Sequence, residues 1–485
     1  MGIVLKQSLQ NTAITYIGFG IGAINTLFLY TNFLSTANYG LVNVIISIAV
    51  LLTPLMAFGV PNTMIKYYSS FKQAKETNGF LTLMLILPLV LMFPIAGVCY
   101  FFYELIGDFL AIKNPIVKGY VWYIYIIGLA MAYFEIFYSW SRVQMKSVFG
   151  NFMKEVFMRL GVMILLVLVY AEILSVPAFL KALVSLYLLR TLIMKVYAYS
   201  TRPPKLNFKF PKNSGSILRY TTLIILGGSI AVVLLEVDKF MLNQYVTIEN
   251  VAYYSVAGFI AIVIGVPARA MHQITYPLTA ELMNANDKEE LKKLYQKSSL
   301  TLGVIAGLLF LLIILNLKDL YTLLPEGYNG GFYIVFLLGI AKVYDSFLGN
   351  TNAILYNSEY YRAVLFMGLF LAVCTVLFNL WFIPMYGLDG AAIATLIAIA
   401  LYNTAKLGYV RAKFKIQPFT RDTLKILGVL FLLGMVMYSI SFSFHPILNI
   451  ALKSMLISAV YVFILYRFNI SEDVNGLIRK YILRK

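Results

Sequence analysis

The chain has 485 residues, of which 61% are hydrophobic and 12% are charged, with a net charge of +18 and a mean hydropathy of +0.82. Soluble proteins carry roughly 25% charged residues, so this composition excludes a large soluble domain. The basic residues stand between apolar runs and form no single patch, which argues against nucleic acid as a partner. Cys99 and Cys374 lie in separate apolar runs, so we expect neither a disulfide framework nor a metal site.

Apolar stretches of about eighteen residues or more recur about fourteen times and predict an all-α polytopic membrane protein. The first six are expected at 9–33, 40–63, 79–103, 117–139, 155–172 and 176–198. The others are expected at 217–243, 252–276, 298–317, 331–350, 362–383, 390–409, 424–442 and 447–466. An even number of spans places both termini on one side of the membrane.

The distribution of Lys and Arg predicts which side this is. If both termini are cytoplasmic, 31 of these residues lie at inner span ends and six at outer ends. Cytoplasmic loops of membrane proteins are enriched in Lys and Arg. We therefore predict cytoplasmic termini.

The spacing of the spans indicates an internal duplication. Segment 34–41 follows the first span, and a similar segment, 248–255, follows the seventh span about 214 residues later. Two six-helix bundles are a common transporter arrangement, with the substrate site at their interface. We predict an N-terminal lobe (1–205), a C-terminal lobe (206–415), and two additional helices with a cytoplasmic tail (416–485).

A polar stripe marks the first span. Asn11, Gly18, Asn25 and Asn32 recur every seven residues and so share one face of the helix. This face meets either a water-filled cavity, where Asn25 would bind substrate, or another helix. Gly18 and Gly22 form a small-xxx-small pair, which lets a neighbouring helix approach closely.

Ionisable residues within spans are costly to bury without a partner or water. Glu236 and Asp238 lie with Lys239 in the outer half of span seven. They form either an internal charge pair or an outward-facing site that couples transport to a cation or proton. Glu135 in span four is a candidate for a pair across helices, and Arg190 in span six fits the positive-inside pattern.

Spans eight and ten carry the remaining candidates. Arg269 and His272 share one face of span eight, in its inner half. Arg269 either snorkels to the cytoplasmic surface or, with His272, meets a phosphate in a cavity. Lys342 and Asp345 in span ten either neutralise each other or belong to the same polar wall, with Asp345 as a further candidate for ion coupling.

Four segments resemble the oligosaccharide and polysaccharide flippases, or O-antigen-type translocases, of the multidrug/oligosaccharidyl-lipid/polysaccharide (MOP) exporter superfamily. Segment 34–41 is similar to that family's first outer loop, 236–242 to the end of its seventh helix, and 251–257 to the start of its eighth. Segment 384–394, Pro-Met-Tyr-Gly-Leu-Asp-Gly-Ala-Ala-Ile-Ala, resembles the hinge between helices eleven and twelve.

The resemblance implies alternating access by two six-helix lobes. It implies that a polyprenyl-diphosphate-linked oligosaccharide crosses the bacterial plasma (inner) membrane, from inner to outer leaflet, for assembly of surface polysaccharide or the O-antigen of lipopolysaccharide. It further implies coupling to H+, Na+ or membrane potential, no cofactor, and membrane lipids and a polysaccharide polymerase as partners. The resemblance does not identify phosphate-binding residues in this chain. Arg269, Lys342 and Glu236 are candidates only because charge within a span is costly to bury.

Other functions remain open. A cation-coupled drug antiporter of the same superfamily usually lacks the two extra helices, whereas a lipid II flippase has them. An enzyme is not expected, because the longest outer loops, 104–116 and 318–330, contain no carboxylate and His pair. A purely structural scaffold would not need ionisable residues on several spans.

Overall fold

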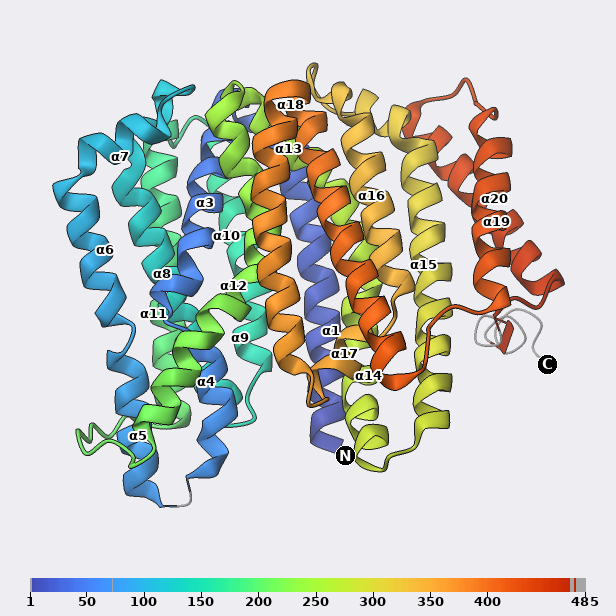
Figure 1. Ribbon diagram of the computed structural model, residues 1–485. Helices are drawn as coiled ribbons and strands as arrows, with labels where there is room; N and C mark the ends of the chain where they lie inside the picture. Colours follow the sequence, from blue (N-terminus) through green and yellow to red (C-terminus); the bar gives the residue numbers. More distant parts are fainter. Residues whose placement is uncertain (1, 72, 472–474, 477–485) are drawn as a thin grey trace. The chain divides into compact units, whose positions relative to one another are not determined.

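The computed structural model describes residues 2–71, 73–471 and 475–476, and its regular elements are helices (Figure 1). This confirms the predicted all-α fold. The chain divides into two compact units, Met1–Ala252 and Tyr253–Lys485. The predicted lobes are defined by the sequence repeat, and they stay a prediction.

Several predicted spans of the first unit consist of consecutive helical elements, and two of these elements are π-helices, η1 and η4. In chain order the helices are α1 (Gly2–Ala23), η1 (Ile24–Leu29), α2 (Tyr30–Phe33), α3 (Thr36–Met56), α4 (Val60–Tyr67), η2 (Tyr68–Ser70), α5 (Ala74–Ile86), α6 (Leu89–Phe101), α7 (Tyr103–Leu110), η3 (Pro115–Tyr120), α8 (Val121–Arg142), α9 (Val148–Phe152), η4 (Met153–Phe157), α10 (Met158–Tyr170), α11 (Val176–Thr201) and α12 (Ser214–Tyr245).

Helix α13 (Ile248–Ile262) crosses the boundary between the units. The helices that follow it are η5 (Val263–Gly265), α14 (Val266–Asn284), α15 (Lys288–Thr322), η6 (Tyr328–Gly331), α16 (Phe332–Phe347), α17 (Thr351–Tyr356), α18 (Tyr361–Phe414), α19 (Arg421–Tyr438) and α20 (Pro446–Arg467). Helix α15 packs against α16, α19 and α20.

Helix α18 comprises two arms that meet at a sharp turn. Gly387 has φ 57° and ψ −126°, a conformation outside the helical region that favours glycine. The two arms run side by side from this turn (Figure 1), and a Cβ at Gly390 would collide with the carbonyl of Phe382. The break lies within segment 384–394, where the resemblance placed a hinge.

Ten helices of the described part are long and apolar enough to cross a bilayer. This number treats α18 as one helix, although its two arms correspond to two predicted spans. It omits α9–α10, α12 and α19, which correspond to three others. The chain is therefore a multi-pass membrane protein, and about fourteen spans account for its helices.

Candidate functional site

The fifth span starts earlier than its apolar run suggests. Elements α9, η4 and α10 form one continuous helix from Val148 to Tyr170, whereas the sequence predicted 155–172. The predicted run excludes residues 148–154, although the backbone there is already helical. Lys154 therefore lies within this helix, together with Arg159, which the predicted run already contained.

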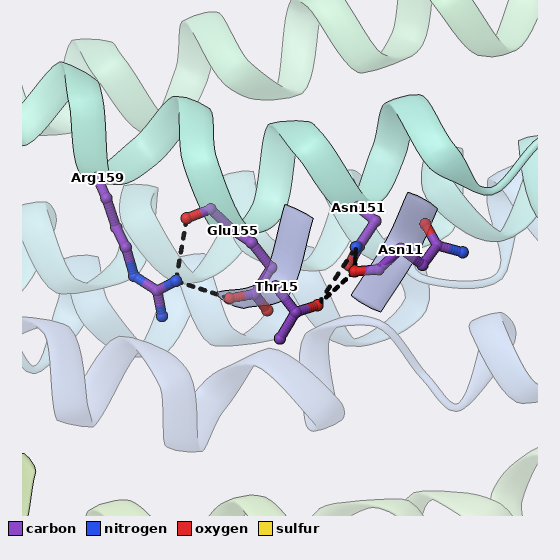
Figure 2. A network of polar contacts seen from close by, with 5 residues as sticks. All are labelled: Asn11, Thr15, Asn151, Glu155 and Arg159. Carbon is purple, nitrogen blue, oxygen red and sulfur yellow. Dashed lines mark hydrogen bonds and ion pairs between the residues drawn. The ribbon is translucent and has the colours of Figure 1, made fainter. Parts of the chain in front are cut away.

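Two groups of polar contacts lie on this helix: the first joins it to α1, and the second lies within the helix itself (Figure 2). In the first, Asn151 donates from Nδ2 to the carbonyl of Asn11 at 3.1 Å and to Oγ1 of Thr15 at 3.5 Å. In the second, Arg159 donates from Nη1 to the carbonyl of Glu155 at 3.0 Å and to its Oε2 at 2.8 Å. The polar stripe of the first span thus faces another helix along much of its length.

Gly18 and Gly22 make this approach sterically possible. A Cβ at Gly18 would lie 2.6 Å from Nη1 of Arg159, and one at Gly22 would lie 3.0 Å from its Nε. One turn further along, Asn25 is 3% exposed and donates from Nδ2 to the carbonyl of Arg159 at 2.7 Å. A contribution of Asn25 to substrate binding stays a prediction.

A second cluster of polar side chains lies in the second unit, around Asp345 on α16. Asn403 on α18 donates from Nδ2 to Oδ1 of Asp345 at 3.1 Å. The charge of Asp345 also acts on Lys342, on Lys406 of α18 and on His272 of α14. These interactions bring together residues from three helices, and we call them the Asp345 cluster.

Lys406 is the member of the Asp345 cluster that the sequence analysis missed. It is only 2% exposed, and its ammonium donates to Oδ1 of Asn352 on α17 at 3.1 Å. The same ammonium lies 4.2 Å from the ring centroid of Tyr402. Lys406 lies inside the predicted span 390–409 and was counted only as one of the basic residues at inner span ends. Tyr402, Asn403 and Lys406 share one helix face, which was the available signal.

Arg269 and His272 connect the Asp345 cluster to α14. Arg269 is exposed, and its charge acts on Lys342, whose stem packs beside Gly265 at the start of α14. The ring of His272 packs edge-on against Tyr276 with centroids 5.6 Å apart. Nδ1 of His272 is buried without a hydrogen-bond partner among the described residues.

The Asp345 cluster carries more positive than negative charge. Among the described residues, the cations Arg269, Lys342 and Lys406 outnumber the carboxylate of Asp345 in this cluster. Positive charge within membrane-spanning helices is costly unless water or a counter-ion is present. The chemistry of this cluster therefore suits an anionic ligand.

The candidates on α12 form a pair within their own helix. Nζ of Lys239 lies 3.0 Å from Oε2 of Glu236, and their side chains are 21% and 20% exposed. Asp238 beside them is 3% exposed. Glu236 thus has the internal charge pair that the sequence left open, while ion coupling by Glu236, Asp238 or Asp345 stays a prediction.

The fold is that of MOP superfamily transporters. A structure described as the lipid II flippase MurJ in an inward closed conformation matches with a TM-score of 0.75 and 16% identity, covering 95% of this chain and 100% of that one. An inward-facing multidrug resistance MATE family transporter of the MOP superfamily gives 0.66 and 15%, covering 84% and 98%. A MOP superfamily transporter from Pyrococcus furiosus, described as having reverse polarity of the binding pocket, gives 0.58 and 15%, covering 85% and 95%.

A family model described as "Polysaccharide biosynthesis protein" matches residues 4–283, and the chain belongs to this family. No curated protein matches the chain in sequence. The expected resemblance to the MOP superfamily is confirmed by the family and the fold together. The family and the similar structures are transporters and not enzymes.

Proposed function

We propose that the protein is a flippase for polyprenyl-diphosphate-linked oligosaccharide, which it moves from the inner to the outer leaflet of a bacterial plasma membrane by alternating access. The glycan would enter assembly of a surface polysaccharide or O-antigen, with a polysaccharide polymerase as a partner. The family match in polysaccharide biosynthesis and the transporter fold support this proposal. The Asp345 cluster is the single observation that carries it.

The charges of this cluster complement the proposed cargo. A diphosphate that links a lipid to a sugar carries two negative charges, which the cations Arg269, Lys342 and Lys406 of this cluster can attract. Arginine matches phosphate oxygens with a planar fork, and lysine binds them as a point charge. Neutralisation by the cargo would lower the cost of charge within the membrane.

The same charge balance distinguishes the alternatives. A cation-coupled drug antiporter binds positively charged cargo, which a net positive cluster repels. A lipid II flippase fits the charge equally well, because its lipid-linked cargo also contains a diphosphate, and the similarity to MurJ favours it as a second candidate. The two candidates differ in the glycan and not in the anionic linkage.

The energy for transport has to come from a source other than ATP hydrolysis by this chain. The sequence contains no Gly-x-x-x-x-Gly-Lys-Ser/Thr loop for ATP. A gradient of H+ or Na+, the membrane potential, or removal of the flipped product would drive net movement. Glu236, Asp238 and Asp345 are the residues to test for ion coupling.

Binding to the purified protein tests this proposal. Native mass spectrometry would compare a polyprenyl-diphosphate sugar with the corresponding monophosphate and a cationic dye, for the wild type and for the Arg269→Ala, Lys342→Ala double variant. We expect the diphosphate to bind best and the double variant to lose at least tenfold in affinity, since each charge-assisted contact contributes about 1.5 to 3 kcal/mol. Full affinity of the double variant would refute the assigned site, and preference for the dye would favour an antiporter.

A further inference from the structure

The first unit contains another group of charges that the proposed site does not use. Nζ of Lys154, on η4, lies 2.7 Å from Oε1 of Glu135, on α8. The charge of Arg190, on α11, also acts on Glu135. Arg142, on the same helix as Glu135, also acts on this carboxylate, and Glu155 also acts on Lys154. The group thus contains two cations from helices next to that of Glu135, with further charges around them.

Arg190 is buried, and one of its guanidinium donors lacks a hydrogen-bond partner among the described residues. It is 6% exposed, its Cζ lies 4.0 Å from the ring centroid of Phe134, and a second ring, that of Tyr187, lies 5.1 Å away. Nε of Arg190 has no hydrogen-bond partner among the described residues. A guanidinium has five donors and no acceptor, and a buried donor without a partner is destabilising. This orphaned donor indicates that an acceptor is needed at this position.

The ion pair beside it is accessible from one side. The side chains of Lys154 and Glu135 are 44% and 28% exposed, although both lie on helices that correspond to membrane spans. Charged side chains within spans face water or a polar pathway and avoid lipid. An anion that reaches Lys154 by this route would compete for the carboxylate on which the charge of Arg190 also acts.

The internal repeat gives this group a counterpart in the second unit. Glu135 lies on predicted span four and Asp345 on span ten, 210 residues later, while Arg190 lies on span six and Lys406 on span twelve, 216 residues later. Both offsets are close to the 214 residues that separate the two similar outer segments. Each half of the repeat thus carries an acid on its fourth helix and a buried cation on its sixth.

We propose that Lys154 and Arg190 form a second oxyanion-binding site, with Glu135 as its built-in counter-ion. The ligand is an oxyanion of the cargo, either a phosphate of the lipid linkage or a carboxylate of an acidic sugar. The identity of that cargo rests on the proposed function, whereas anion binding by this site does not. An entering oxyanion competes with Glu135 for the two cations, so Glu135 tunes the affinity of the site.

The test measures anion binding in a background that disables the Asp345 cluster. The full-length protein with Arg269→Ala and Lys342→Ala, in lipid nanodiscs, would be titrated calorimetrically with inorganic pyrophosphate and separately with glucuronate. Lys154→Gln is expected to weaken the remaining binding about tenfold, because one charge-assisted contact is lost. Glu135→Gln is expected to strengthen it, because the competing carboxylate is removed. Tighter binding of pyrophosphate would identify the ligand as a phosphate of the lipid linkage. Tighter binding of glucuronate would identify it as a carboxylate of an acidic sugar.

Lys195→Gln, on the same helix as Arg190 and exposed, is the matched control and should leave binding unchanged. Thermal unfolding of each variant establishes that it is folded. Absence of binding for both probes in this background would overturn the proposal. So would binding that responds to neither Lys154→Gln nor Glu135→Gln. Transport of lipid-linked glycan, measured separately, could fail while this anion site is still present.

Discussion

Lys406 is a lysine whose ammonium is removed almost completely from solvent. Among the described residues its hydrogen bond goes to the neutral amide of Asn352, and the carboxylate of Asp345 acts on it electrostatically. Burial of a charge costs several kcal/mol when its compensation is incomplete. A residue that destabilises the fold in this way fits a role in binding an anion better than a role in packing.

Replacing Lys406 with Met tests this interpretation. Met has a similar volume and no charge, so we expect the midpoint of thermal unfolding to stay equal or rise. Affinity for pyrophosphate should fall about tenfold, because one cation of the cluster is lost. Differential scanning fluorimetry and calorimetric titration measure the two quantities. A marked loss of stability with unchanged affinity would assign Lys406 a structural role.

The sequence predicted part of the Asp345 cluster. Arg269, Lys342 and Asp345 were identified because a charge inside an apolar stretch is conspicuous, and the structure brings them together. Lys406 and Arg159 lie inside the predicted spans 390–409 and 155–172, but they were counted among the basic residues at inner span ends, because each lies near the inner end of its span. Position near a span end does not show whether a side chain reaches the membrane surface or packs between helices.

At the level of single helices, α1 depends on the small residues in its contact with the fifth span. The predicted small-xxx-small pair is confirmed at Gly18 and Gly22, where Arg159 occupies the space that side chains would need. Gly20, on another face of α1, has nothing within 4 Å of an added Cβ. The two kinds of position therefore differ in what a methyl group would do.

We expect Gly18→Ala to destabilise the protein by about 1 to 3 kcal/mol, because its methyl group would overlap the carbonyl of Glu155. Gly20→Ala should be neutral or stabilising, since alanine favours a helix by about 1 kcal/mol over glycine. Unfolding in detergent, followed by circular dichroism, compares the two variants. Equal stability of both would show that the contact between α1 and the fifth span is loose.

Not every feature of the elements could be predicted. The turn within 384–394 was recognisable from its Pro and Gly residues, and the break lies at Gly387. The π-helices η1 and η4 have no comparable signal, because they depend on how the packed helices accommodate side chains. The sequence did not predict that the fifth span starts at Val148, because the first turns of this helix are polar.

For the whole molecule, the distribution of charge predicts the orientation in the membrane. With both termini cytoplasmic, inner span ends hold 31 basic residues and outer ends hold six. Such a difference is large compared with the few charges that suffice to orient a membrane protein.

Cysteine labelling measures this orientation. In a variant with Cys99→Ala and Cys374→Ala, cysteines would replace exposed lysines at positions 212, 413 and 113, one at a time. An impermeant thiol reagent added to intact cells should label Lys113→Cys only, because positions 212 and 413 are predicted to be cytoplasmic. Labelling of Lys212→Cys or Lys413→Cys from outside would reverse the topology.

Reconstituted transport tests the central claim most directly. The purified protein would be incorporated into liposomes with a fluorescent polyprenyl-diphosphate oligosaccharide in both leaflets, and an impermeant quencher would be added outside. Without transport only the outer half of the fluorescence is lost, whereas a flippase exposes the inner pool as well. We predict near-complete quenching by the wild type, and quenching that stops near one half for the Arg269→Ala, Lys342→Ala double variant. An inner pool that stays protected from the quencher with the wild-type protein, while the same liposomes accumulate cationic dye against a gradient, would contradict the account.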